Sequence, residues 1–126
     1  MGANGVVVAV LRSPLHRMMS RAMCVVEYRG RVSGRMYRLP VQYVRDFYAV
    51  EILVGRAEQK RWWRNFRSEG EAELLLARRS VPMRAIAVVG AEQPEAAEAM
   101  AARYRARFPR VTIDPATAVF VRCDPR

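Results

Sequence analysis

The stretch YRGRVSGRMYRLPVQYVR, residues 28–45, decides the fold of this chain. It begins at the end of a nearly all-apolar run, residues 22–28, which is typical of a buried strand. Two glycines follow, Gly30 and Gly34, and they mark a turn. From residue 35 to residue 45 the side chains alternate in character, which indicates a second strand. Pro40 removes one backbone donor from that strand and therefore favours an edge position or a bulge.

Outward from these two strands, the chain predicts four further strands. They lie at residues 47–54, 71–77, 81–89 and 117–123, with Arg78-Arg79-Ser80 at a hairpin bend. Helices are expected from Ser13-Pro14, over residues 58–67, and after Pro94 to about residue 107. This order predicts one α+β domain over residues 1–126, with a six-stranded antiparallel sheet that could close into a small barrel.

The net charge indicates an anionic partner. The 22 Lys and Arg residues outnumber the 12 acidic residues, which gives a formal charge of +10 over 126 residues. Such a surplus on a small domain fits nucleic acid, membrane phosphate or a polyanionic ligand, and composition alone does not choose among them. The apolar fraction of 52% excludes a largely disordered chain.

Cysteine and histidine usage favours no metal site. Cys24 and Cys123 lie far apart without CxxC spacing, so we expect reduced, buried thiols in a cytoplasmic protein. The one histidine, His16, has no recognised ligand spacing to either thiol. The apolar run at residues 6–11 is too short to span a membrane. Peripheral membrane contact through residues 6–19 is an alternative to a helix packed on the barrel.

Three segments are candidates for chemistry. The turn at residues 28–35 holds two glycines, a hydroxyl and several guanidinium groups, which suits either a phosphate cradle or a solvated basic turn. The strand at residues 38–43 is either an ordinary edge strand or one whose bulge aims groups at a ligand. In the third segment, residues 55–66, Trp62 and Trp63 are adjacent on an expected helix. They cannot both face one core stripe, so one indole could lie beside a flat ligand.

Together these segments resemble the deazaflavin-dependent nitroreductase family, the F420-binding members of the flavin split-barrel group. The resemblance covers about residues 11–109. It rests on a Gly-Arg-x-Ser-Gly turn at residues 30–34 and a Pro-x-x-Tyr-x-Arg-Asp strand at residues 40–46. A small-residue loop at residues 54–56 and Lys60 with Trp-x-x-Asn at residues 62–65 complete the pattern.

The resemblance implies a six-stranded split barrel that holds F420 in a groove and transfers hydride from the reduced deazaflavin to a quinone or nitro compound. Tyr43 would be a candidate catalytic residue and Phe108 a candidate substrate-binding residue. The implied cofactor-binding residues are Arg31, Val32, Ser33, Arg38, Pro40, Val41, Gln42, Tyr43, Val54, Gly55, Arg56, Lys60, Arg61, Trp62, Trp63 and Asn65.

The sequence departs from the family pattern in two places, one of which bears on the choice of substrate and the other on the strand register. The family's Tyr-Pro-x-Tyr segment stands here as Phe108-Pro109-Arg110-Val111, without its hydroxyl groups. The glycine that family members carry after the Asp is replaced by Phe47, so that turn must be made differently.

Other readings stay open. The same barrel could bind FMN, haem or F420 without this activity. A basic nucleic-acid-binding domain would explain the charge, although no known motif supports it and nucleic acid is not the expected partner. A small-molecule acceptor is expected as partner, and a homodimer is an open alternative.

Overall fold

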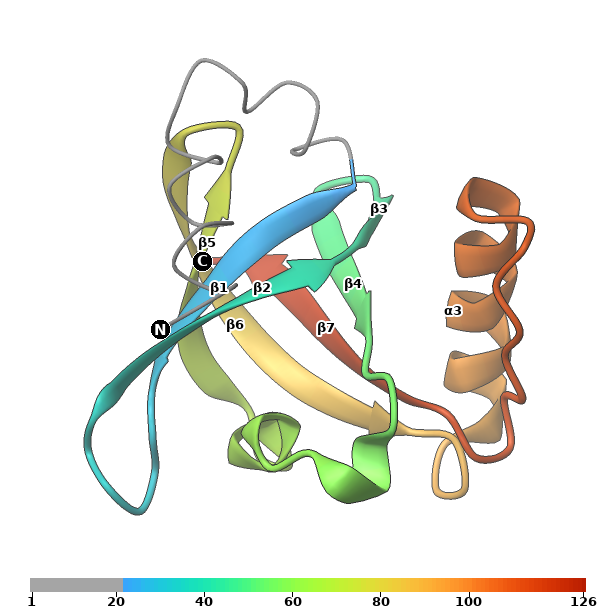
Figure 1. Cartoon of the computed structure of the whole chain (residues 1–126), viewed down its shortest axis with the longest axis horizontal. Coiled ribbons are helices and arrows are strands. Elements are labelled where there is room, and N and C mark those ends of the chain that lie inside the picture. Colours follow the sequence, from blue (N-terminus) through green and yellow to red (C-terminus); the bar gives the residue numbers. More distant parts are fainter. Residues whose placement is uncertain (1–21) are drawn as a thin grey trace.

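The computed structural model describes residues 22–126, which form a curled antiparallel sheet with one long helix against it (Figure 1). The helix expected from Ser13-Pro14 and the membrane contact at residues 6–19 lie outside the described residues. Within the described range, no helix has the length and apolar character needed to cross a membrane.

Seven strands make up the sheet, in the order β2-β1-β5-β6-β7-β4-β3. Every neighbouring pair is antiparallel. The strands are β1 (Met23–Arg29), β2 (Met36–Gln42), β3 (Val44–Asp46), β4 (Ala49–Leu53), β5 (Gly70–Leu76), β6 (Arg79–Val89) and β7 (Val119–Pro125).

The prediction of six strands is wrong by one because the strand expected over residues 35–45 is divided at Tyr43. Its first part, β2, pairs with β1, whereas its second part, β3, pairs with β4. The two end strands of the sheet are therefore consecutive pieces of chain (Figure 1). The sheet curls until its ends meet along this one segment.

The backbone groups at this division are satisfied by hydrogen bonds. The Tyr43 amide donates to the carbonyl of Ala22 at 2.9 Å. The Gln42 carbonyl accepts from the buried Tyr104 hydroxyl at 3.0 Å, and that hydroxyl accepts from the Leu53 amide at 3.2 Å. Because buried backbone groups must find partners, these bonds allow the strand to change neighbours. Pro40 lies in β2, an end strand of the sheet, where it is the partner of Val25 in β1. Of the two positions expected for this proline, an edge strand or a bulge, the structure shows the edge strand.

The core has two parts. One fills the curled sheet with side chains such as Ile52, Leu74 and Met83, each almost fully buried. Burial of a side chain of this size contributes roughly 1.5–3 kcal/mol. The free thiols of Cys24 and Cys123 lie in the same cluster, so the expected buried, reduced pair is confirmed.

The second part of the core lies between the sheet and α3 (Pro94–Arg107), where Met100 and Tyr104 pack near Phe120. Beside it, the fully buried Glu51 of β4 accepts two 2.7 Å bonds from Arg103 of α3. A third 2.7 Å bond comes from Arg122 of β7, which also donates to Asp46 at 2.9 Å. This carboxylate–guanidinium network ties α3 to the sheet.

Two local predictions need correction. The single helix expected over residues 58–67 is two short 3₁₀ helices, η1 (Ala57–Gln59) and η2 (Trp62–Phe66), each too short to make an α-helical face. The bend between β5 and β6 falls at Ala77 and Arg78, whose φ angles are 47° and 70°. A two-residue turn with both φ angles positive matches the twist of the flanking strands, so β6 already begins at Arg79.

Candidate functional site

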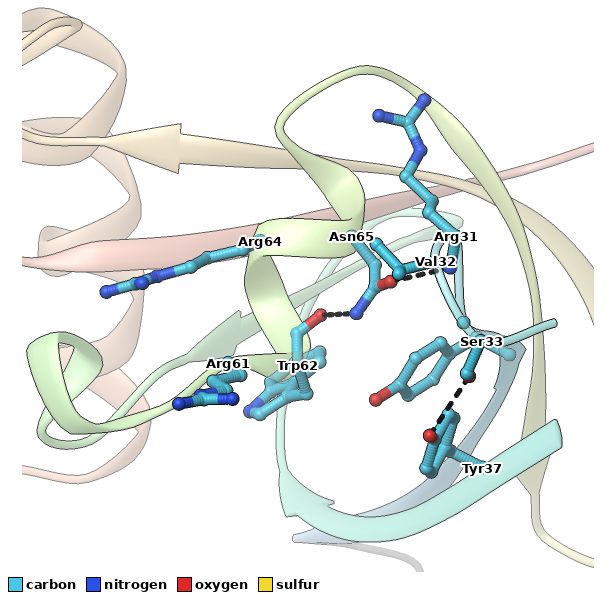
Figure 2. A pocket seen from close by; sticks show the side chains of 10 residues that line it. Arg31, Val32, Ser33, Tyr37, Arg61, Trp62, Arg64 and Asn65 are labelled. Carbon is cyan, nitrogen blue, oxygen red and sulfur yellow. Dashed lines mark hydrogen bonds between the residues drawn. The ribbon is translucent and has the colours of Figure 1, made fainter. Parts of the chain in front are cut away.

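The turn between β1 and β2 faces η2 across a cavity of about 710 Å³, here called the turn pocket (Figure 2). Two parts of the chain about thirty residues apart meet there because β1 pairs with β5, which follows η2. The lining residues are Tyr28, Gly30, Arg31, Val32, Ser33, Tyr37, Arg61, Trp62, Arg64 and Asn65.

The turn itself is held closed by its own hydrogen bonds. The Gly30 amide donates to the Arg35 carbonyl at 2.7 Å, and the Gly34 amide donates to the Gly30 carbonyl at 2.9 Å. Gly34 has a φ of 72°, a conformation that favours glycine. A Cβ at Gly30 would come within 2.8 Å of both Ser33 Oγ and the Tyr37 ring, so the absent side chain lets these groups approach.

Aromatic rings form one wall of the turn pocket. Tyr28 and Tyr37 are cross-strand partners, and their rings stack with centroids 5.5 Å apart and an interplanar angle of 24°. Burial raises the pKa of the Tyr28 hydroxyl, with a smaller contribution from Tyr37, so this phenol stays neutral. The Tyr37 hydroxyl lies 3.1 Å from Ser33 Oγ. The wall therefore combines flat apolar faces with paired hydroxyl groups.

Asn65 joins the two sides of the pocket. Its Oδ1 accepts from the Arg31 amide at 3.0 Å, and its Nδ2 donates to the Trp62 carbonyl at 2.9 Å (Figure 2). One amide side chain therefore sets the spacing between the glycine turn and η2.

The two adjacent tryptophans have different environments. Trp63 is 4% exposed and its indole Nε1 donates to the Ala57 carbonyl at 2.8 Å, so it belongs to the core. Trp62 is partly buried and lines the pocket. The expectation that both indoles cannot enter one core stripe is confirmed.

Three arginines are among the residues that line the turn pocket. Arg31 comes from the turn, and Arg61 and Arg64 come from the segment around η2 (Figure 2). The guanidinium group of Arg61 lies beside Trp62, whereas those of Arg31 and Arg64 extend away from the space between the turn and η2 (Figure 2). The Arg64 guanidinium lies 5.5 Å from the centroid of the Trp63 ring. Ion pairs within residues 22–126 involve other cations, namely Arg38, Arg67, Arg84, Arg103, Arg122 and Arg126. The charges of the three pocket arginines are thus not offset by a paired carboxylate there, and they suit an anionic ligand.

The turn pocket brings together six of the residues implied by the family resemblance: Arg31, Val32, Ser33, Arg61, Trp62 and Asn65. The others lie elsewhere. The Arg38 guanidinium pairs with Glu27 at 2.6 Å on the solvent side of β2. Gly55 and Arg56 line a separate cavity of about 340 Å³, next to the buried Val54. Val41 and Trp63 are core, while Gln42 and Lys60 are exposed.

Tyr43 is 6% exposed and lines a third cavity, here called the arginine pocket. The lining of the arginine pocket is Tyr43, Val44, Arg45, Arg103, Ala106 and Arg107. Phe108 packs against Tyr104 at the end of α3, with ring centroids 5.6 Å apart. Neither Tyr43 nor Phe108 lines the turn pocket, and their roles stay predictions.

Tyr28 and Arg64 lie in the candidate segments 28–35 and 55–66 but are not among the cofactor-binding residues that the resemblance implies, and Tyr37 lies outside those segments; all three line the pocket. A signal for the two tyrosines was present: a hairpin centred on residues 30–34 makes residues 28 and 37 cross-strand partners. Arg64 lies within the candidate segment 55–66, but its position relative to the pocket depends on the 3₁₀ geometry of η2.

Comparison with known proteins identifies the fold. Neither protein-family profiles nor curated protein sequences match this chain. A solved structure from Listeria innocua, provisionally named a pyridoxamine 5'-phosphate oxidase, aligns with a TM-score of 0.56 and 10% identity, covering 97% of this chain and 92% of that one. A protein described as a domain-swapped dimer aligns with a TM-score of 0.52 and 13% identity, over 90% and 97% of the two chains.

An F420-H2 dependent reductase, FDR-A, aligns with a TM-score of 0.51 and 18% identity, over 80% of this chain and 93% of its own. At these identities the similarity shows the fold alone. The described residues therefore have the antiparallel, split-barrel-like α+β fold of these structures, with seven strands where the sequence resemblance implied six.

Proposed function

We propose that the turn pocket binds F420 and that the protein is an F420H2-dependent reductase acting on an electron-poor acceptor such as a quinone or nitro compound. One observation carries this proposal: aromatic faces and three arginines, none of them ion-paired with a carboxylate of residues 22–126, line the same 710 Å³ cavity. The name of one structural neighbour, an F420-H2 dependent reductase, adds support at the level of the fold.

The residues present fit such a cofactor. A volume of 710 Å³ lies within the range of about 300–1,000 Å³ that is usual for small-molecule sites. The faces of Tyr37 and Trp62 offer stacking area to a flat ring. The Arg61 guanidinium beside Trp62 suits the phosphodiester that F420 carries, and Arg31 and Arg64 at the margin of the pocket would face its longer glutamate tail (Figure 2).

The chain's own residues would bind and orient rather than react. Reduced F420 supplies the hydride when it is bound. Asn65 of η2 fixes the distance between the turn and η2 through its bond to Arg31, and its bond to Trp62 within η2 holds the side chain in place, so the pocket is shaped before a ligand enters. Of the hydroxyls of Ser33 and Tyr37, one donates to the other, which leaves one hydrogen to donate to a ligand oxygen. Remote contacts of this kind hold a reacting ring in place.

Binding can be tested by titrating the protein with F420 and, separately, with FMN while tryptophan fluorescence is recorded. We expect saturable quenching by F420, most of which is lost in Trp62→Phe. Arg61→Gln should weaken F420 binding by at least about 10-fold, since it removes a charge-assisted contact. Arg84→Gln is the matched control, because it removes the same charge from an exposed strand position outside the pocket.

Three outcomes decide the assignment. Quenching by F420 together with oxidation of F420H2 by menadione or a nitroaromatic compound supports the reductase. Quenching by FMN alone favours the alternative in which the same barrel binds FMN. Quenching by neither cofactor, in a protein with an intact circular dichroism spectrum, refutes the proposal.

A homodimer also stays a prediction. One neighbour is described as a domain-swapped dimer, which concerns that protein. Sedimentation of this chain at several concentrations would decide whether it self-associates.

A further inference from the structure

The arginine pocket is a second candidate binding site, separate from the turn pocket. Its volume is about 650 Å³, and it lies between β3 and α3. Within the part of the chain that the structure describes, the two pockets share no lining residue. Among residues 22–126, six line the arginine pocket; three of them are arginines, Arg45, Arg103 and Arg107, and none of the six is acidic.

Each of these guanidinium groups is held by a neighbouring side chain. Arg103 makes its two 2.7 Å bonds to the buried Glu51, which fixes its position on α3. The Arg45 guanidinium lies 6.0 Å from the centroid of the Tyr43 ring, and that of Arg107 lies 4.8 Å from the Phe108 ring. Cations placed against aromatic rings are partly immobilised, so less freedom is lost when they bind an anion.

The rest of the lining is apolar or weakly polar. Tyr43 and Val44 are 6% and 7% exposed, and Ala106 stands one residue before Arg107 on α3. Burial raises the pKa of the Tyr43 hydroxyl, while Arg45 and Arg107 oppose that shift. The phenol is therefore neutral at physiological pH.

We infer that the arginine pocket binds a small organic anion, one with a carboxylate or phosphate head on a short apolar body. The guanidinium groups of Arg45 on β3 and Arg107 on α3 would bind the oxygen atoms, since planar forks match both carboxylate and phosphate geometry. Arg103 lines the pocket but is already paired with Glu51 and lies 3.7 Å from Asp46. The surfaces of Tyr43, Val44 and Ala106 would contact the apolar body. This site does not depend on the function proposed for the turn pocket.

The test is isothermal titration with benzoate, phenyl phosphate, inorganic phosphate and the neutral benzyl alcohol. We expect benzoate or phenyl phosphate to bind saturably, and whichever binds more tightly identifies the head group. Inorganic phosphate should bind more weakly because it lacks the apolar body. Benzyl alcohol should not bind, because it brings no charge to the guanidinium groups.

Variants then locate the binding. Arg107→Gln and Arg45→Gln should each weaken binding of the aromatic anion by about 10-fold, as expected for loss of a charge-assisted contact. Both positions are exposed, so these variants should fold. Arg84→Gln, which lowers the net charge equally from a distant strand, should change affinity less than about 2-fold.

Arg61→Gln separates the two pockets. If it weakens binding of the aromatic anion as much as Arg107→Gln does, the anion occupies the turn pocket and the inference is wrong. Absence of saturable binding by both aromatic anions, equal losses in Arg84→Gln and Arg107→Gln, or equally tight binding of benzyl alcohol would also overturn it.

Discussion

Replacing Glu51 by Gln tests whether the buried carboxylate holds α3 on the sheet. Glu51 is fully buried and accepts three bonds of 2.7 Å, two from Arg103 and one from Arg122. Glutamine keeps the shape but removes the negative charge, and it replaces one acceptor oxygen by a donor group that faces a guanidinium.

The size of the effect follows from these contacts. A hydrogen bond to a charged acceptor contributes about 1 kcal/mol more than a neutral one, so three bonds amount to roughly 3 kcal/mol. The side chains of Arg103 and Arg122 are 33% and 27% exposed, so water recovers part of that loss. We expect Glu51→Gln to lower the free energy of unfolding by about 2–3 kcal/mol. With an unfolding entropy of about 2.1 cal/mol/K per residue, Tm should fall by roughly 8–12 °C.

Urea denaturation followed by tryptophan fluorescence and far-UV circular dichroism measures this change. Glu71→Gln is the matched control, because Glu71 is 76% exposed and pairs with Arg126 at 2.9 Å on the surface. That variant should cost less than about 0.5 kcal/mol. If Glu51→Gln is no less stable than the Glu71→Gln control, the carboxylate–guanidinium network does not stabilise the packing of α3 on the sheet.

Three further predictions concern local features. Phe47 is 91% exposed and has a φ of 55°. In urea titrations, Phe47→Gly should leave the core intact and raise the free energy of unfolding by up to about 1 kcal/mol. A clear loss of stability would instead show that the Phe47 ring makes a stabilising contact. The hydrogen bond from Arg122 lowers the pKa of Asp46, so the folded state favours the carboxylate. The stabilisation from this ion pair is complete above the unfolded pKa of about 3.9 and is lost as pH falls through the lower pKa of the folded state. Asp46→Asn should therefore make the free energy of unfolding fall less steeply below about pH 5 in acid titrations. An unchanged slope of the free energy of unfolding against pH would contradict this. Burial raises the pKa of both thiols, that of Cys123 to about 12. Cys24 and Cys123 should therefore not react with Ellman's reagent at pH 8 until the protein is denatured. Rapid labelling of the native protein would contradict the burial of these thiols.

Much of the fold could be predicted because the strands are encoded locally. Alternation over residues 35–45 and the hairpin that follows residue 70 both depend on neighbours in sequence. The division at Tyr43 could not be predicted in this way. It arises because one segment pairs first with β1 and then with β4, and β4 comes later in the chain.

The candidate sites show the same division between local and distant information. The glycine turn and Trp62 were predicted from sequence and line one pocket in the structure. The arginine pocket was not predicted, because Arg45 lies on β3 while Arg103 and Arg107 lie on α3, almost sixty residues later. Only tertiary packing places these three charges around one cavity.

The divided strand at residues 36–46 also determines how the barrel opens. Since this single run of chain hydrogen-bonds to β1 at one end and to β4 at the other, detaching it exposes amides on both of those strands. In native-state hydrogen exchange, β1 and β4 should therefore lose protection as one cooperative unit, although twenty residues separate them in sequence. A proteolytic cut beside Tyr43 would break that unit, and the barrel would then unravel from both sides.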